Sequence, residues 1–263
     1  MTTLRVAAVQ HAPAWQDRDA TLEALTPTVA VAASTGARMV VLPEMFAVGF
    51  TMAVAQVAEP EDGPTVTWMR EQAAHLDVWV VGSVPEVRPG DERPGNVCCL
   101  VTPDGTVHRY AKRHPFGMAD EPAHYRAGDT HLTVDVDGVR VTPTVCYDLR
   151  FPEQYRATAD DTDAYLVVAS WPAPRAQHWS ALLVARAIEN QAYVVGVNRV
   201  GVDGNGLEQA GRSVVVDPLG QELVRAGDAA TILSADLDTD LVAQVRRDLP
   251  FLGDRRADEL PST

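Results

Sequence analysis

The repeated alternation of short apolar stretches with helical ones constrains the fold of this sequence more strongly than any other feature. The first apolar stretch, Leu4–Gln10 (LRVAAVQ), is followed by a helix-like segment over Asp19–Ser34, and about a dozen such stretches recur along the chain. Turn residues at 103–105 (PDG) and 137–138 (DG) join some of them into antiparallel hairpins. So many strands, combined with about four or five helices, predict an α/β fold of two packed sheets covered by helices.

The other predicted strands share the same apolar composition. They span Arg38–Pro43, Val78–Val84, Asn96–Thr102, Thr106–Tyr110, Leu132–Val136, Val139–Val145, Ala164–Ala169, Ala192–Asn198, Gly211–Val216, Glu222–Val224 and Ala229–Asp236. The last of them is expected to pair with the hairpin that precedes it. Further helices are predicted over Thr65–His75 and Gln177–Asn190. No linker long or polar enough to separate domains occurs, so we expect a single domain over residues 1–250 and a charged tail over residues 251–263.

Composition and charge narrow the class of protein. Of the 263 residues, 46% are hydrophobic and 22% are charged, as in a soluble globular protein. The formal net charge of −14 argues against binding to nucleic acid or to an anionic membrane surface, since either needs a basic patch. The glycine-rich stretch at 201–206 (GVDGNG) lacks the Lys-Ser/Thr of a phosphate-binding loop and is interpreted as turns. No signal-peptide-like segment and no run of about 18 apolar residues occurs, so we expect a cytoplasmic protein that acts on a small molecule.

The cysteines and histidines indicate neither a disulfide framework nor a metal site. Three cysteines are an odd number, and Cys98 and Cys99 stand side by side in an apolar strand, where we interpret both as structural. His114, His124 and His178 have a spacing that matches no compact set of metal ligands. We therefore expect no metal and no cofactor.

Three predicted apolar strands are each followed directly by a residue whose side chain could take part in catalysis. Glu44 follows the strand end VVLP beside Met45 and Phe46, a setting that desolvates a carboxyl group and favours its use as a base. Lys112 follows a hairpin strand and can lower the pKa of a nearby thiol or donate a hydrogen bond to an oxyanion. Cys146 ends the stretch VTPTV at a predicted sharp turn before a helix-like segment. A base, a cation and a thiol at three strand ends are what acyl transfer through a thioester requires.

Taken singly, each of these three residues has an ordinary structural interpretation. Cys146 alone fits a small buried hydrophobe, Glu44 fits an acidic residue at a helix N-terminus, and Lys112 fits a solvated surface cation. From the residues alone, both the catalytic and the structural interpretations stay open.

The motifs around these residues resemble those of the nitrilase superfamily of carbon–nitrogen hydrolases. That family is characterised by a Glu-Lys-Cys triad in a four-layer αββα sandwich. Glu44 in LPEMF, Lys112 in KRH and Cys146 in CYDLRFPE match its three motifs in order, and the similarity runs from residues 9–17 (VQHAPAWQD) to residues 217–220 (DPLG). The resemblance therefore implies an αββα sandwich and an amide-hydrolysing enzyme.

Within the superfamily, the chain is most similar to bacterial ω-amidases, which hydrolyse the terminal amide of 2-oxoglutaramate and related 2-oxo-acid monoamides. The stretches that carry this similarity are LPEMFAVGFTM, KRHPFGMADEPAHYRAGD and SWPAPRAQHWSALLVARAIENQAYVVGVNRVGVDGNG. A second glutamate of the family matches Glu121, seven residues before Gly128. The chain departs from the family at Pro115, where leucine is common after KRH, and at Pro122.

The resemblance also implies roles for individual residues. Cys146 attacks the amide carbon, and Glu44 takes the thiol proton, passes it to the departing ammonia and then activates water. Lys112 and the backbone N–H of Tyr147 hold the oxyanion, and Glu121 orients Lys112 or the substrate nitrogen. The members that this chain resembles pair with a second copy, so a homodimer or higher homo-oligomer is expected.

Substrate recognition is predicted from chemistry, because a 2-oxo acid needs a cation for its carboxylate. Arg175 is the first candidate for that cation, and Arg150 and Arg113 are the alternatives; Arg150 also suits a structural clamp beside the nucleophile. The pocket walls are expected from the aromatic residues Phe116, Tyr125 and Trp171. Alternative functions are hydrolysis of another small amide, an N-carbamoyl compound or a nitrile, and, from a different class, a non-catalytic binding protein with the same fold.

Overall fold

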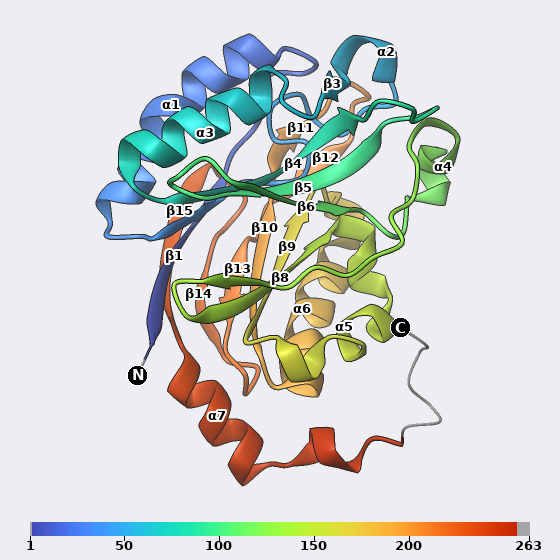
Figure 1. Ribbon diagram of the computed structural model, residues 1–263. Coiled ribbons are helices and arrows are strands. Elements are labelled where there is room, and N and C mark those ends of the chain that lie inside the picture. Colours follow the sequence, from blue (N-terminus) through green and yellow to red (C-terminus); the bar gives the residue numbers. More distant parts are fainter. Residues whose placement is uncertain (1, 257–263) are drawn as a thin grey trace.

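The structure of the protein is a computed structural model that describes residues 2–256, and two β-sheets form its centre (Figure 1). The first sheet has the strand order β15-β1-β2-β4-β5-β6, with β3 paired to β4. Its strands are β1 (Thr3–Gln10), β2 (Met39–Val41), β3 (Glu59–Pro60), β4 (Trp79–Val87), β5 (Gly95–Val101), β6 (Val107–Ala111) and β15 (Thr231–Asp238).

The second sheet has the strand order β14-β13-β10-β9-β8-β7. Its strands are β7 (Val134–Val136), β8 (Val139–Val145), β9 (Ala164–Ala169), β10 (Tyr193–Asn198), β13 (Val214–Val216) and β14 (Glu222–Arg225). A separate two-stranded hairpin is formed by β11 (Val200–Val202) and β12 (Glu208–Ala210).

Helices cover the outer face of each sheet, which makes the four-layer αββα sandwich that the sequence predicted. Helices α1 (Arg18–Ser34) and α3 (Pro64–Leu76) pack on the first sheet, and α5 (Pro152–Arg156) and α6 (Ala176–Asn190) lie on the second. The remaining helices are α2 (Val54–Val57), α4 (Glu121–His124) and α7 (Thr239–Asp248).

The period of two along the strands explains this layering. In β1, Val6 and Ala8 belong to the core between the sheets, whereas Ala7 and Val9 pack against the helices outside. In β9, Leu166 points to the same inter-sheet core. A strand buried on both faces has no need for polar residues, which is why these segments are continuous apolar runs in the sequence.

The sequence interpretation predicted the wrong pairing partner for the last strand, β15. The strand β15 does not extend the β13–β14 hairpin but pairs antiparallel with β1 along its whole length, from Thr3 opposite Asp238 to Gln10 opposite Thr231. The edge strand β14 is short and largely exposed, whereas β1 offers a long, buried edge at which a final strand completes the first sheet. The chain therefore crosses back to the sheet in which it began.

The sequence interpretation missed several elements, among them the short segments α2, β3 and α4, the β11–β12 hairpin and helix α7. The stretch 201–206, predicted as turns only, includes part of β11 and the turn of the β11–β12 hairpin. Helix α7 begins at Thr239 and buries Val242 and Val245; its N-cap residue, Asp238, accepts a hydrogen bond from the amide of Asp240. Of the predicted tail over residues 251–263, Phe251–Asp254 form a short 3₁₀ turn and residues 257–263 lie outside the described part of the chain, so the domain boundary stays a prediction.

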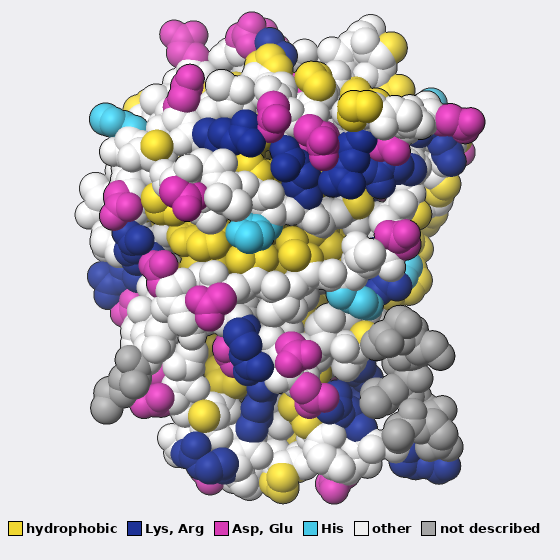
Figure 2. Space-filling view, in the orientation of Figure 1, with side chains coloured by type: hydrophobic (Ala, Val, Ile, Leu, Met, Phe, Trp, Pro, Cys, Tyr) yellow, Lys and Arg dark blue, Asp and Glu magenta, His cyan; other side chains and the backbone are white. Residues whose placement is uncertain are grey.

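Charges of both signs lie on the face of the molecule in Figure 2, where Arg side chains lie among Asp and Glu. Ion pairs account for many of the arginines, such as Arg109 with Glu86 and Arg140 with Asp163. Within residues 2–256, no helix is both long and apolar enough to cross a membrane.

Candidate active site

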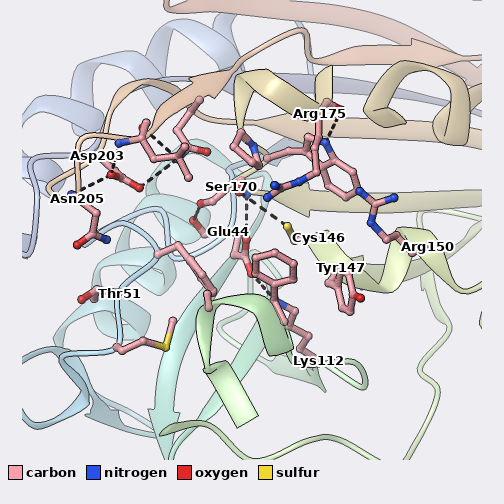
Figure 3. A pocket seen from close by; sticks show the side chains of 18 residues that line it. Glu44, Thr51, Lys112, Cys146, Tyr147, Arg150, Ser170, Arg175, Asp203 and Asn205 are labelled. Atoms are coloured by element: carbon pink, nitrogen blue, oxygen red, sulfur yellow. Dashed lines mark hydrogen bonds and ion pairs between the residues drawn. The ribbon is translucent and has the colours of Figure 1, made fainter. Parts of the chain in front are cut away.

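The side chains of Glu44, Lys112 and Cys146 meet at one end of the sandwich, between the two sheets. Glu44 lies just after β2 and Lys112 just after β6 in the first sheet, while Cys146 directly follows β8 in the second. Glu44 and Lys112 are each only 1% exposed, and Cys146 is partly exposed toward a cavity (Figure 3). Burial of a carboxylate and an ammonium group is costly unless they are paired, and these two are 2.9 Å apart.

Cys146 sits at a sharp turn with backbone φ of 46°, in the left-handed region that non-glycine residues rarely adopt. A 3₁₀ turn over Cys146–Arg150 and then α5 follow, in agreement with the predicted strand, turn and helix. The strained conformation projects the side chain out of the strand end and toward the cavity.

Asp148 holds this turn in place. Its fully buried carboxylate accepts hydrogen bonds from the amide of Val145, from the hydroxyl of Tyr110, and from both the amide and Nδ1 of His114, at 2.8 to 2.9 Å. These contacts make Asp148 a structural support of the turn that carries Cys146. Because His114 lies two residues after Lys112, the same carboxylate also ties the lysine-bearing segment to the cysteine-bearing turn.

We expect Asp148→Ala to lower the free energy of unfolding by about 3 kcal/mol or more, because it leaves several buried donors without an acceptor. Urea denaturation of the parent and the variant measures this difference. The control is Asp135→Ala, whose exposed side chain accepts a single hydrogen bond from Gly138 and whose loss is expected to stay near 1 kcal/mol. Equal losses for the two variants would contradict the proposed scaffold role of Asp148.

Four polar side chains form a closed, buried cluster behind the thiol. Glu44 Oε1 accepts hydrogen bonds from Lys112 Nζ at 2.9 Å and from Asn96 Nδ2 at 2.8 Å. Glu121 Oε2 accepts from Lys112 Nζ at 2.8 Å, and Glu121 Oε1 accepts from Asn96 Nδ2 at 3.2 Å. The second oxygen of Glu44 accepts from the amide of Ser170 at 2.9 Å. Lys112 thus uses two of the three protons of its ammonium group on carboxylates and keeps one for another acceptor.

Electrostatics raise the pKa of both Lys112 and the Cys146 thiol. Burial by itself lowers the pKa of Lys112, but the adjacent charges of Glu121 and Glu44 outweigh it and raise that pKa above its ordinary value. The Cys146 sulfur is enclosed even though part of the residue reaches the cavity, and its burial together with the charge of Glu44 raises the pKa of the thiol well above its usual range. Lys112 and the carbonyl of Ser170, 3.9 Å from the sulfur, oppose that rise. Such a thiol reacts only when a base removes its proton.

Glu121 reaches this cluster from the loop after β6. It begins α4, and its carboxylate also accepts the amide hydrogen bond of Phe116, which closes the loop between the two residues. Pro122, one of the two departures from the family pattern, lies in the first turn of α4, where the missing N–H breaks no helical hydrogen bond. This proline is therefore compatible with a buried Glu121.

The cavity beside Cys146 has a volume of about 300 Å³ and is lined by most of the predicted substrate-binding residues. Phe116, Tyr147, Arg150, Trp171 and Arg175 all line it. A cavity of this size suits a small metabolite rather than a peptide side chain with its backbone.

Two residues predicted near the substrate lie elsewhere. Tyr125 does not line the cavity, because its ring packs in the core between the first sheet and its helices. Its hydroxyl donates to the carbonyl of Thr51 at 2.7 Å, so it supports a wall residue from behind. Arg113 lies against His131 and is not part of the lining either.

The two arginines of the cavity differ from most arginines in the described chain, because neither forms an ion pair with a carboxylate there. Arg150 lies over the ring of Trp171, 4.8 Å from its centre, and contacts His178 at 3.2 Å. Arg175 lies over the ring of Phe116, 5.4 Å from its centre. Stacking on an aromatic face orients a guanidinium group but leaves its hydrogen-bond donors available for an anionic ligand.

Several residues at the site were not found from the sequence. Asn96 and Ser170 contact Glu44 directly, and the turn of the β11–β12 hairpin contributes Asp203 and Asn205 to the opposite wall of the cavity. Their side chains have no distinctive spacing, and only the pairing of the strands brings them to the site.

The histidines considered for a metal site lie at separate places. His114 bonds to Asp148, His124 lies near Asp120, and His178 lies beside Arg150. Over residues 2–256, no group of three or more His, Cys, Asp or Glu side chains has an arrangement that could hold a metal ion.

A cysteine thiol at a strained strand end, backed by a buried carboxylate–ammonium cluster in an αββα sandwich, is the arrangement of a thiol-dependent hydrolase. A family model described as carbon–nitrogen hydrolase matches residues 5–247, and the chain belongs to that family. It is an amide-hydrolysing enzyme of this family, for which a cysteine thioester mechanism is characteristic.

Known proteins are similar to this chain over most or nearly all of its length. The sequence is 44% identical over 262 residues to the omega-amidase YafV of Escherichia coli K12, covering 98% of both chains. It is 33% identical over 227 residues to a 2-oxoglutaramate amidase of Bacillus subtilis, covering 86% of this chain and 87% of that protein. Among solved structures, it is similar to XC1258 of Xanthomonas campestris, described as a CN-hydrolase superfamily protein, with a TM-score of 0.93, 38% identity and 98% coverage of both chains.

Proposed function

We propose that this protein hydrolyses the terminal amide of a small 2-oxo-acid monoamide of the 2-oxoglutaramate type, with water, to the dicarboxylic 2-oxo acid and ammonia. The observation that carries the proposal is the cavity itself. It has the thiol cluster on one side and two arginines without carboxylate partners on another, so it matches a ligand with an amide at one end and a carboxylate at the other. The names of the relatives in Escherichia coli and Bacillus subtilis support the same substrate class.

In the first half of the reaction, Cys146 attacks the amide carbon while Glu44 takes the thiol proton. The carbon–sulfur bond forms, and the negative charge moves to the former carbonyl oxygen. The remaining proton of Lys112 Nζ and the backbone N–H of Tyr147 donate hydrogen bonds to that oxygen. Glu44 then gives its proton to the amide nitrogen, the carbon–nitrogen bond breaks, and ammonia leaves a thioester on Cys146.

In the second half, Glu44 removes a proton from a water molecule that attacks the thioester carbon. The same oxyanion donors stabilise the second tetrahedral intermediate, the carbon–sulfur bond breaks, and the proton returns to the sulfur. Glu121 does not touch the reacting atoms in this scheme. It holds Lys112 at 2.8 Å and shares with Glu44 the single positive charge of the cluster.

A panel of substrates tests the proposed function directly. Ammonia release is measured with 2-oxoglutaramate, glutamine, butyramide, an N-carbamoyl amino acid and a short nitrile. We expect kcat/KM to be highest for 2-oxoglutaramate. If kcat/KM for glutamine or butyramide equals that for 2-oxoglutaramate, the 2-oxo-acid assignment fails. A higher kcat/KM for the N-carbamoyl compound or the nitrile would support the corresponding alternative.

We expect Arg175→Met to raise KM for 2-oxoglutaramate by about 10- to 100-fold, because it removes a charge-assisted hydrogen bond to the substrate carboxylate. For butyramide, which has no carboxylate, KM is expected to change by less than about 3-fold. Initial rates of ammonia release give both constants. The control Arg247→Met, at an exposed position of α7, is expected to leave both substrates unaffected. An equal effect of Arg175→Met on both substrates would argue against a carboxylate contact.

We further propose that the protein forms a homodimer and is cytoplasmic. The resemblance to the nitrilase superfamily supports the dimer, and the three free cysteines suit a reducing compartment. Light scattering during size-exclusion chromatography is expected to give about twice the 28.4 kDa of one chain.

A further inference from the structure

One residue of the buried cluster contacts all three of its charged members. Asn96 lies in β5 and is 1% exposed. Its Nδ2 donates to Glu44 Oε1 at 2.8 Å and to Glu121 Oε1 at 3.2 Å, and its backbone carbonyl accepts from the amide of Lys112 at 2.8 Å. A single side-chain amide therefore joins the two carboxylates that the lysine joins from the other side.

The charges of the cluster explain why an amide is needed at this position. Two buried carboxylates share one ammonium group, and like charges this close repel each other. Asn96 supplies two further N–H donors without adding a charge. The same charges assign the orientation of the Asn96 amide, because a flipped amide would point its oxygen at two carboxylates. In the assigned orientation that oxygen has no hydrogen-bond partner among the described residues.

We propose that Asn96 is a positioning residue for the reaction: its side-chain amide holds the carboxylate of Glu44 where it accepts the thiol proton, and it keeps Glu121 on Lys112. This inference rests on the proposed role of Glu44 as the base. The other contacts of Glu44 do not replace that of Asn96. The amide of Ser170 binds the opposite carboxylate oxygen, and Lys112 is itself shared with Glu121.

The variant Asn96→Asp tests the proposal with almost no change of shape. When the introduced carboxyl group is ionised, it presents an acceptor to two carboxylates, so we expect kcat at pH 8 to fall by about 100-fold or more, with KM changed by less than about 3-fold. When it is protonated, its O–H can again donate, and kcat relative to the parent is expected to rise as the pH falls from 8 toward 5. The titratable or charged groups that face this position are Glu44, Glu121 and Lys112, with Cys146 and Tyr125 beside them. Asn96→Ala lacks any donor and is expected to show no such recovery.

The matched control is Asn190→Asp, the same exchange at another fully buried asparagine. Its Nδ2 donates to the carbonyl of Arg186 at 2.9 Å, and its Oδ1 also has no partner among the described residues. A purely structural loss is expected here, so Tm falls while the pH profile of the folded enzyme stays parallel to that of the parent. If Asn96→Asp behaves in the same way, without recovery at low pH, Asn96 has only a structural role.

Alkylation of Cys146 by iodoacetamide separates this inference from the proposed substrate. The rate, followed by intact mass, requires no amide substrate and depends on proton removal by Glu44. We expect Asn96→Asp to slow it at pH 8 by about the same factor as kcat, whereas Asn190→Asp leaves it unchanged. A parent enzyme that releases no ammonia from any amide would overturn the proposed function, while equal alkylation rates of the parent and Asn96→Asp would overturn the role of Asn96.

Discussion

Replacement of Cys146 by alanine is expected to lower kcat for 2-oxoglutaramate by at least about 10⁴-fold, because Cys146 is the only thiol among the described residues that line the cavity. The fold is expected to persist, since the removed thiol is small and its hydrogen bond to the carbonyl of Ser170 is long, at 3.9 Å. Ammonia release under saturating substrate, with circular dichroism to verify folding, measures the effect.

Cys98→Ala is the control for that variant. Cys98 lies in the core between the two sheets, and its burial raises the pKa of its thiol far above the ordinary value. Activity per folded molecule is therefore expected to stay within about 10-fold of the parent. Residual activity of Cys146→Ala above 1% of the parent would mean that the nucleophile has been misassigned.

Lys112→Ala is the second variant with a large expected effect, and it acts on both rate and stability. The loss of an oxyanion donor is expected to lower kcat by about 10²- to 10³-fold. Lys112 forms ion pairs with both Glu44 and Glu121, so its loss leaves two buried carboxylates without this cation, which is expected to cost about 3–5 kcal/mol of unfolding free energy. Steady-state rates and urea denaturation measure the two effects separately.

Arginine does not substitute for lysine at this position. Lys112 is the only lysine of the sequence, and the other 21 of the 22 basic residues counted as Lys or Arg are arginines. A compact ammonium group fits between two carboxylates and an oxyanion, whereas a planar guanidinium group does not. Lys112→Arg is therefore expected to remain at least about 10²-fold below the parent in kcat. Parent-like activity of either Lys112 variant would contradict an oxyanion role for this residue.

The sequence predicted most of the strands and the strand ends that bear the catalytic candidates, because both follow from local patterns. Apolar runs such as Ala164–Ala169 coincide with the observed strand, and Glu44, Lys112 and Cys146 each stand where such a run ends. Their meeting depends on contacts across 34 to 102 positions of sequence, which no local pattern specifies. Only the joint agreement with the motifs of a known family indicated that they lie together.

Features that depend on packing between distant elements escaped prediction. Asn96 reaches Glu44 because β5 lies between β4 and β6 in the sheet, and nothing in the stretch NVCCLV distinguishes its first residue from an ordinary strand residue. Tyr125 was expected at the substrate as an aromatic wall residue, but its ring packs in the core. The strand β15 joins β1 because both edges are long, a fit that becomes visible only when the sheet is assembled.

The central claim is that Cys146 carries the acyl group of a carboxylate-bearing amide. Mixing the enzyme with 2-oxoglutaramate and quenching in acid within one turnover traps any thioester, and peptide mass spectrometry locates it. The account predicts a mass increase equal to that of the acyl group on the peptide that contains Cys146, absent in Cys146→Ala and formed together with one equivalent of ammonia. Ammonia release without any adduct on that peptide, or an adduct at Cys98 or Cys99 instead, would contradict it.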